Sequence, residues 1–472
     1  MPVIHHVATP GIGHVGHLVA DLASRRALVV DPTRDVEPYL EFARLHDLEI
    51  AWVLDTHGHN DYLSGVRTIV ERTGAVAIAP IGLSTGYEAE LGWHRRVIEL
   101  GPSVRVQLVH TPGHTPEHTA VVVTGVDELP VLLSGGSLLI GDLGRPDLLG
   151  DAAQWARAAD AARHSVLEVL APLPDDTLLA PTHVGGSPCA GGLEEGTSST
   201  LGEQRARNRA VRAMVEGEPW FDATVAPPVP RYWSTVRRAN IAGVEPAAIG
   251  VAPERIEADA LRHASSVVGA SLDDVLLVDV RDLDPDVTTH PRAVHVPPGA
   301  AFAMWAGIVA HGHDRVVRVA DDEHQARHAS DQLLLVRERP VDGWVDAHEL
   351  GGEPSVDGAG GDRATQADHD DHAETVADWF TAPEEVDWAG RVLVDVRGPS
   401  EVRARPYDAD VVVPAQQLLA DPSLAPAGRL AIACAAGYRA AIVASLLRRD
   451  GIDAIAIDGA PTPNLATLGG VA

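Results

Sequence analysis

Two histidines and an aspartate occupy alternate positions in the segment Thr56–Asp61, which reads THGHND. The apolar run Ile50–Leu54 just before it is typical of a buried strand, so the segment is expected to form a loop at that strand's end. Neutral imidazole and carboxylate groups are the usual ligands of a catalytic Zn or Fe ion. The spacing therefore predicts that His57, His59 and Asp61 converge on a metal. The alternative is a polar loop whose histidines are only solvated.

Two later histidines stand in similar positions. His114 lies in Thr111–Pro116 (TPGHTP) and His183 ends Ala180–His183 (APTH), each directly after an apolar strand pattern. A single core histidine would not recur in this way at successive strand ends. The pattern indicates one metal site built from loops that are far apart in the sequence.

A second reactive group is Cys434, which follows the predicted strand Arg429–Ala433 and precedes a helical pattern through Arg449. A turn between a strand and a helix N-terminus directs backbone N–H groups inward, and with the helix dipole they stabilise an anion on the sulfur. Arg439 adds positive charge for an anionic sulfur donor. The turn consists of Ala435, Ala436, Gly437 and Tyr438. The alternative is a buried, inert cysteine.

Length and composition limit the classes of protein that fit. A chain of 472 residues is expected to form two to four domains. The net charge is −30, and all 37 basic residues are arginine, which argues against nucleic acid or anionic membrane as a partner. No apolar run reaches the ~20 residues of a membrane span, and no signal pattern is present, so a cytoplasmic location is expected. With only Cys189 and Cys434, a disulfide framework is not expected.

The elements that must position these residues fall into three parts. Over residues 1–245, short apolar runs alternate with helical patterns, which favours a layered α/β domain. The strand pattern Leu276–Arg281 (LLVDVR) then recurs as Val392–Arg397 (VLVDVR), and each copy is followed by a second strand and a helix. The repeat predicts two related parallel-sheet domains, 250–350 and 375–472. The segment 351–374, rich in Gly, Asp and His, is expected to be a flexible linker.

The N-terminal motifs together resemble the metallo-β-lactamase superfamily, whose αββα sandwich binds one or two metals at its strand ends. Residues Val30–Asp35, Leu54–His57 and Ile140–Asp147 narrow the resemblance to the persulfide dioxygenase branch, and to its bacterial fusions with rhodanese modules. That resemblance implies one Fe(II) on two histidines and an aspartate, and oxidation of glutathione persulfide to sulfite.

On this chain His57 and His114 match the two histidines of that family, but Gly136 stands where the Asp ligand belongs. The resemblance therefore implies a degenerate or altered metal site. In such a site, His59, Asp61 and His183 could help to hold Fe(II). Two alternatives are that the site holds Zn instead, or that it binds no metal.

The pattern C-x-x-G-x-R from Cys434 to Arg439, with Asp395-Val396-Arg397 upstream, resembles the active-site loop of a rhodanese. That family implies a cysteine that takes a sulfur atom from thiosulfate or a persulfide and passes it to a thiol such as glutathione. The 250–350 copy has an acidic loop and no cysteine at this point, so a catalytically silent module is expected.

The sequence thus predicts a sulfurtransferase acting at Cys434, linked to a persulfide dioxygenase-like domain. Two alternatives stay open: a zinc-dependent hydrolase of the glyoxalase II type, and a non-catalytic sulfur carrier or sensor. The expected partners are small persulfides, thiosulfate and thiols, and a homo-oligomer is left open.

Overall fold

The computed structural model describes residues 2–9, 11–185, 187, 189, 196–258, 261, 275–339, 341–350 and 374–461. The chain divides into two compact units: Met1–Ile249 with Gln332–Pro340, and Gly250–Asp331 with Val341–Ala472. The segment 332–340, which the sequence placed in the second part, belongs to the first unit. There it accepts a hydrogen bond of 2.6 Å from Leu63 N–H to Leu335 O, and one of 3.1 Å from Arg34 Nη1 to Arg337 O.

The first unit contains two six-stranded sheets. The first sheet has the order β1-β2-β3-β4-β5-β6, and the second has the order β12-β11-β10-β9-β8-β7. The strands of the first sheet are β1 (Pro2–Thr9), β2 (His14–Asp21), β3 (Arg26–Val30), β4 (Glu49–Leu54), β5 (Val76–Ala79) and β6 (Glu90–Leu91). Those of the second are β7 (Val97–Gly101), β8 (Val104–His110), β9 (Thr119–Gly125), β10 (Val131–Gly135), β11 (Leu178–Pro181) and β12 (Ser199–Thr200).

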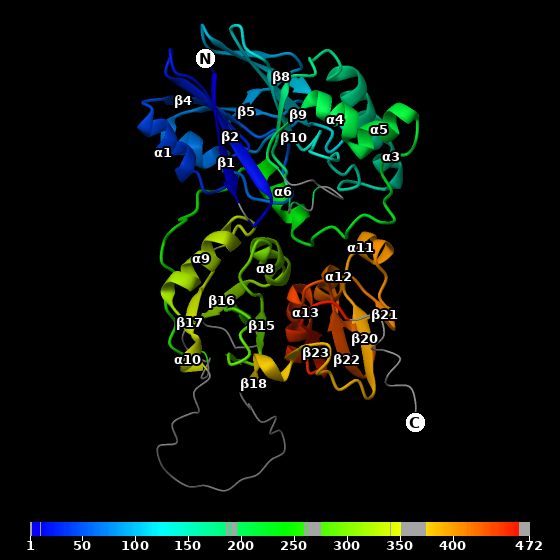
Figure 1. Ribbon diagram of the computed structural model, residues 1–472. Coiled ribbons are helices and arrows are strands. Elements are labelled where there is room, and N and C mark those ends of the chain that lie inside the picture. The colour runs from blue at the N-terminus through cyan, green and yellow to red at the C-terminus, as the bar shows by residue number, and fades with distance from the viewer. Residues whose placement is uncertain are drawn as a thin grey trace. The chain divides into compact units, whose positions relative to one another are not determined.

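The two sheets pack face to face, with helices on both outer faces (Figure 1). One apolar cluster, including Leu28, Leu54 and Leu133, joins strands of both sheets. The outer helices of the first sheet are α1 (Glu37–Leu45) and α2 (Val66–Thr73), and those of the second are α3 (Ala152–His164), η1 (Ser165–Val169), α4 (Leu201–Arg207) and α5 (Arg209–Glu216). A further helix, α6, spans Trp233–Ala242. This αββα layering confirms the predicted α/β fold of the first unit.

The second unit holds two parallel sheets. The first is β15-β13-β16-β17, and the second is β19-β23-β22-β20-β21. The strands of the first are β13 (Val275–Asp279), β15 (Ala293–His295), β16 (Arg315–Ala320) and β17 (Gly343–Asp346). Those of the second are β19 (Phe380–Thr381), β20 (Arg391–Asp395), β21 (Val411–Val412), β22 (Arg429–Ala433) and β23 (Ala454–Ile457). A two-stranded antiparallel pair joins β14 (Thr288–Thr289) to β18 (Glu374–Thr375).

Helices connect these strands. They are α8 (Phe302–Ala310), α9 (Glu323–Leu334), α10 (Ala347–Leu350), α11 (Pro399–Ala404), α12 (Ala415–Ala420) and α13 (Tyr438–Arg449), with short 3₁₀ turns η3 (Val376–Asp378) and η4 (Pro422–Leu424). The repeat read from the sequence has the same strand register in both copies. Asp279 pairs with Val319 of β16, and Asp395 pairs with Ala433 of β22. The next residue in the two copies is Ala320 and Cys434, respectively.

Of the predicted linker 351–374, only Glu374 lies among the described residues. Within the described residues, no helix is both long and apolar enough to cross a membrane.

Candidate functional site

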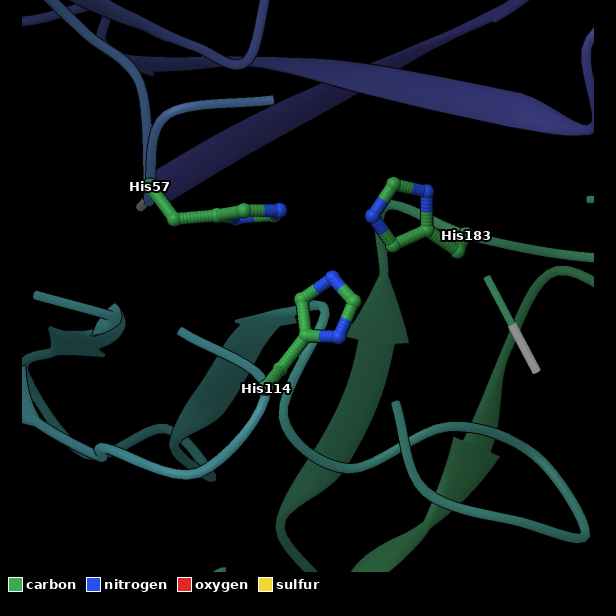
Figure 2. Close-up of side chains that lie close together, drawn as sticks. All are labelled: His57, His114 and His183. Carbon is green, nitrogen blue, oxygen red and sulfur yellow. The ribbon is translucent and has the colours of Figure 1, made fainter. Parts of the chain in front are cut away.

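Three imidazole rings converge in the first unit (Figure 2). His57 follows β4, His114 follows β8 and His183 follows β11, so the loops come from both sheets. One ring nitrogen of each lies within 4.8 Å of the others, and all three side chains are buried. The structure thus brings together three of the five metal ligands predicted from the sequence, in a cluster that could hold a metal ion.

Hydrogen bonds fix which nitrogen of His57 is protonated. Thr56 Oγ1 donates to Asp31 Oδ2 over 3.0 Å, so its own proton is used. The 2.9 Å contact between Thr56 Oγ1 and His57 Nδ1 must then be donated by the imidazole, which leaves the lone pair on Nε2. Burial, and next the neighbouring imidazole of His59, lower the pKa of His57 well below its usual value, so the ring is neutral.

The protonated nitrogen of His114 is fixed in the same way. Its Nδ1 donates to the carbonyl of Arg145 over 3.0 Å, and a carbonyl only accepts, so Nε2 keeps a lone pair. Burial, followed by the charge of His183, lowers the pKa of His114 to about 3. Both histidines therefore present the neutral form that binds a metal, each held by a partner on its other nitrogen.

His183 and Asp61 are buried without the hydrogen bonds that such groups normally make. His183 Nδ1 lies 3.2 Å from Asp61 Oδ2, but among the described residues neither nitrogen of His183 and neither carboxylate oxygen of Asp61 has a hydrogen-bond partner of good geometry. Each unsatisfied buried polar group costs about 1–3 kcal/mol. A cation bound here would remove that cost, so the donor set fits a metal.

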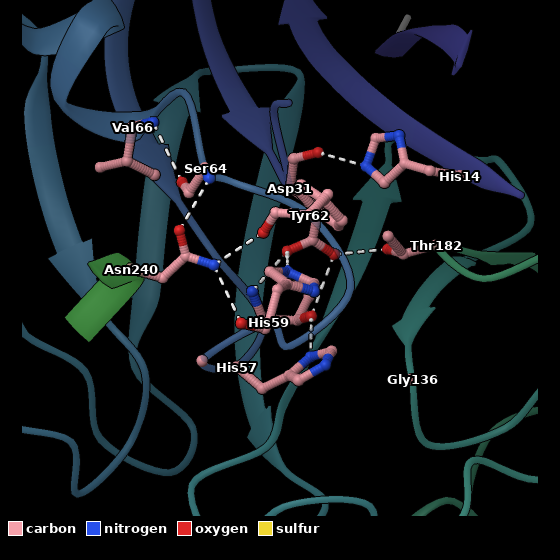
Figure 3. Close-up of polar contacts among 12 residues, drawn as sticks. His14, Asp31, His57, His59, Tyr62, Ser64, Val66, Gly136, Thr182 and Asn240 are labelled. Carbon is pink, nitrogen blue, oxygen red and sulfur yellow. Dashed lines mark hydrogen bonds and ion pairs between the residues drawn. The ribbon is translucent and has the colours of Figure 1, made fainter. Parts of the chain in front are cut away.

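His59 faces a different partner (Figure 3). Its Nε2 lies 2.9 Å from Asp31 Oδ1, and Asp31 also accepts a 2.6 Å bond from Thr56 N–H. Burial alone would raise the pKa of Asp31, but the charge and hydrogen bond of His59 hold the pKa of Asp31 below its usual value. Burial alone would lower the pKa of His59, but the Asp31 carboxylate raises it above its usual value. Burial, only partly offset by His59, raises the pKa of Asp55 to about 7.

The predicted ligands therefore form overlapping groups. His57, His114 and His183 make one; His59 and Asp61 share His183 in another, also within 4.8 Å. Sequence spacing did not reveal that Asp31 holds His59, because the two residues meet only through the pairing of β3 with β4.

Gly136 lies directly against the histidines. A Cβ atom built at Gly136 would lie 2.5 Å from His114 Cδ2, closer than real Cβ atoms come, and 3.1 Å from His183 Cδ2, which is tighter than most real contacts. Gly136 N–H donates to His118 Nε2 over 2.9 Å, and His118 Nδ1 contacts Thr111 Oγ1 at 2.8 Å. The space for a carboxylate at position 136 is thus occupied by imidazole rings, while both nitrogens of His118 are engaged.

Three side chains that the sequence analysis missed hold the loop around His57. Glu117 Oε1 accepts from Gly58 N–H at 3.0 Å and from Arg237 of α6 at 2.9 Å. Asn240, also on α6, donates to His59 O at 2.9 Å and to Tyr62 O at 2.8 Å (Figure 3). No local pattern marks these residues, because α6 lies about 180 positions beyond the loop that it holds.

The second thiol of the chain, Cys189, is buried near this site. Burial, and next the charge of Asp61, raise the pKa of Cys189 well above its usual value. At neutral pH it is therefore a protonated thiol.

Cys434 forms the other candidate site, at the end of β22 and at the start of the turn into α13. The thiol is free and buried. Arg439 makes a two-bond ion pair with Glu401, with N–O distances of 2.6 and 2.7 Å. Burial would lower the pKa of Arg439, but Glu401 and then Cys434 raise it, as expected for a guanidinium near both groups.

The turn is closed by residues from neighbouring segments. Gly437 has φ +77°, and a Cβ there would lie 2.9 Å from the ring of Phe380, so both conformation and space require glycine. Tyr438 OH donates to Pro297 O over 2.9 Å. Beneath the turn, Arg397 pairs with Asp395 at 2.7 Å and stacks on Tyr407, with 3.3 Å from guanidinium to ring centroid. The structure therefore brings Cys434 and Arg439 together, with Ala435, Ala436, Gly437 and Tyr438 forming the turn between them.

The other module reaches the same point without a nucleophile. Ala320 ends β16 where Cys434 follows β22, and Asp321 lies 3.6 Å from Arg281. Asp322 accepts from Gln325 N–H at 2.7 Å, at the start of α9. In this module, Asp321 and Asp322 therefore stand at the positions that follow the strand, where the other module has the turn that begins at Cys434.

The first unit is similar in sequence to known proteins. Residues 17–183 match the model of the Metallo-beta-lactamase superfamily. A hydroxyacylglutathione hydrolase of Polaromonas sp. is 33% identical over 174 residues, which cover 35% of this chain and 60% of the relative. The chain thus matches less than two thirds of that relative's length.

A solved structure shows the same fold. A metallo-beta-lactamase from Staphylococcus aureus subsp. aureus COL superposes with a TM-score of 0.63 at 22% identity, over 73% of this chain and 99% of its own. ETHE1 from Myxococcus xanthus has a TM-score of 0.41 at 23% identity, over 51% of this chain and 98% of its own. The N-terminal unit therefore has the metallo-β-lactamase fold, and its cluster of His and Asp residues is one that could bind a metal.

Proposed function

We propose that the chain is a sulfurtransferase whose nucleophile is Cys434, joined to a metal-dependent hydrolase domain. The observation that supports sulfur transfer is the placement of Cys434 between the end of a parallel strand and the N-terminus of the twelve-residue helix α13, beside Arg439. Backbone N–H groups of such a turn stabilise a thiolate and a terminal persulfide sulfur.

The proposed reaction has two steps. The Cys434 thiolate attacks the outer sulfur of thiosulfate; a new S–S bond forms, the original S–S bond breaks, and sulfite leaves with the electron pair. An acceptor thiolate such as glutathione then attacks the outer sulfur of the Cys434 persulfide, and Cys434 leaves as the thiolate. Arg439 is placed to balance the negative charge of the donor, and its ion pair with Glu401 fixes its position.

The test is the rate of sulfur transfer from thiosulfate to cyanide or glutathione. Cys434→Ser is expected to abolish transfer, whereas Cys189→Ser keeps the wild-type rate as a matched control. Transfer that persists in Cys434→Ser would refute the assignment.

For the first unit we propose hydrolysis at a zinc ion held by His57, His114 and His183. This proposal is supported by three imidazoles whose ring nitrogens lie within 4.8 Å of one another; the lowered pKa values of two of them, His57 and His114, keep these rings neutral. Three histidines are a typical donor set for catalytic zinc, whereas non-haem iron oxygenases use two histidines and a carboxylate. Gly136 cannot provide that carboxylate to the three-histidine group, so this group favours zinc; the overlapping group of His59, Asp61 and His183 has the composition that suits iron.

A bound zinc ion would supply Lewis acidity and an activated water. The chain's own residues hold the donors: Thr56 and the carbonyl of Arg145 orient His57 and His114, and Asp61 contributes negative charge beside His183. The hydroxyacylglutathione hydrolase relative, 33% identical in this region, makes a glutathione thioester the first substrate to assay.

Metal analysis and two assays separate hydrolysis from the dioxygenase alternative. Protein reconstituted with equal Zn and Fe(II) is expected to retain one Zn per chain and to hydrolyse S-lactoylglutathione. Retention of Fe with oxygen uptake on glutathione persulfide would instead support the dioxygenase.

A further inference from the structure

A cavity of about 330 Å³ lies in the first unit, beside the loop that carries His114. Volumes of about 300–1,000 Å³ are typical of small-molecule sites. Its lining consists of Pro112, Gly113, His114 and Pro116 from the loop after β8, Pro146 and Leu149 from the segment after β10, and Gln154, Arg157, Ala158 and Ala161 from α3. Because His114 is one of the proposed zinc ligands, the cavity adjoins the metal site and is placed to hold a part of the substrate that extends from the metal.

One face of α3 forms a wall of this cavity. Gln154, Arg157, Ala158 and Ala161 stand at positions i, i+3, i+4 and i+7 of the helix, and this spacing puts their side chains on the same face. The helix rises about 1.5 Å per residue, so Arg157 stands about 6 Å along the helix axis from Ala161.

The last turn of α3 is held against the loop that supplies the metal ligand. A Cβ atom built at Gly113 would lie 2.5 Å from Ala162 Cβ, so the loop and the helix approach closely there. Just past the helix, Ser165 Oγ donates to Pro112 O over 2.7 Å. A chain that starts at the metal site and follows the wall therefore passes this contact first and reaches Arg157 further along the helix.

Arg157 is an exposed cation on an otherwise largely apolar lining of proline, leucine and alanine. Within the part of the chain that the structure describes, it makes no hydrogen bond or ion pair. Asp147, in the segment after β10, is already paired with Arg145 at 2.6 Å, and Gln154 Oε1 already accepts from Asp151 N–H over 2.8 Å. The cavity thus combines apolar walls with one guanidinium that is available to an anionic group.

We propose that this cavity receives an apolar chain that ends in a carboxylate, and that Arg157 selects for this carboxylate. The methylene groups of the chain lie against Leu149, Ala158 and Ala161, and the carboxylate accepts from the guanidinium of Arg157. On the hydrolysis proposed above, on which this inference rests, the chain is the acyl group of a thioester formed by a dicarboxylic acid. Arg157 is then a specificity-determining residue for that reaction.

Calorimetry on the full, zinc-loaded chain tests the proposal with thioethers of glutathione, which cannot be hydrolysed. The probes are S-carboxyalkyl glutathiones with three, four or five methylene groups. Each is compared with the S-alkyl glutathione in which a methyl group replaces the carboxylate. For at least one chain length, the carboxylate probe is expected to bind at least about threefold more tightly, as is usual for a pair with an exposed arginine. The difference is expected to shrink at high salt concentration.

Substitutions of residues on α3 locate the binding. Arg157→Gln is expected to remove the preference for the carboxylate and to leave the affinity for the alkyl probe unchanged, whereas Arg157→Lys keeps the charge and part of the preference. Arg163→Gln is the matched control, because Arg163 lies on the same helix without lining the cavity, and it is expected to bind both probes like wild type. Ala158→Phe fills the cavity and is expected to weaken both probes at least about tenfold.

The proposal is overturned if no probe binds, if the carboxylate and alkyl probes bind equally at every length, or if Arg157→Gln weakens both probes alike, since Arg157 would then contact the glutathione part. Because Arg157 is exposed, its variants are expected to fold, and thermal unfolding checks this for each variant.

Hydrolysis of S-lactoylglutathione by the same preparation reports separately on the proposed reaction. Hydrolysis without a carboxylate preference would overturn the inference alone. A carboxylate preference that depends on Arg157, without hydrolysis of any thioester, would support the cavity assignment and refute the proposed reaction.

Discussion

Substitution of Gly136 by alanine should selectively damage the three-histidine site. The added Cβ would lie 2.5 Å from His114 Cδ2, and an ordinary contact is at least 3.4 Å, so His114 must move by about 0.9 Å. Metal–ligand distances tolerate only about 0.2 Å. His114 is therefore expected to leave the set of ligands, since its ring is also held at Nδ1 by the carbonyl of Arg145.

The expected loss of zinc affinity follows from the loss of one metal ligand. Changes in the partners of metal ligands typically cost about 10–100-fold in affinity, and displacement of a ligand itself should cost at least about 100-fold, or about 2.7 kcal/mol. Overpacking also lowers folding stability by about 1–3 kcal/mol. Gly136→Asp adds the same Cβ, so it is expected to lose zinc affinity as well rather than to complete the site.

Competition with a chromophoric zinc chelator measures the affinity, and circular dichroism during urea unfolding measures the stability. Gly185→Ala is the matched control, because a Cβ at Gly185 meets nothing within 4 Å. Equal zinc affinity in Gly136→Ala and wild type would show that the site does not use His114 as described.

Three further perturbations address other parts of the structure. Glu401→Gln removes the charged partner of Arg439 and should lower kcat/KM for thiosulfate at least about tenfold, whereas the exposed Glu384→Gln should leave steady-state kinetics unchanged. Asn240→Ala removes three bonds to the backbone of the metal loop and should lower the free energy of unfolding in urea by about 3 kcal/mol; a loss under 1 kcal/mol would contradict that role. Burial, then His6, lowers the pKa of His17 to about 3, so the unfolded chain binds a proton below pH 6.5 that the folded chain does not. Stability should thus fall by up to about 1.4 kcal/mol per pH unit from pH 6.5 toward pH 3, and His17→Gln should make the fall shallower in thermal melts.

Much of the architecture could be read from local patterns. The helix predicted before Arg449 is α13, and the strand before His57 is β4, because hydrophobic periodicity reports burial directly. The convergence of His57, His114 and His183 could also be anticipated, since each directly follows a strand of the sandwich.

Contacts between distant segments could not be read in this way. The pairing of His59 with Asp31 and the support from α6 depend on the register of strands and the packing of a helix far along the chain. The crowding around Gly136 likewise depends on distances that differ by less than about 1 Å from an ordinary contact. A sequence pattern identifies a missing carboxylate there, but only coordinates show that imidazole rings fill its place.

Mass spectrometry of the intact protein after incubation with thiosulfate tests the central claim of sulfur transfer most directly. The account predicts one added sulfur atom per chain, located at Cys434 by peptide mapping and removed by cyanide or glutathione. An unmodified chain, or a sulfur atom carried on Cys189 instead, would contradict it.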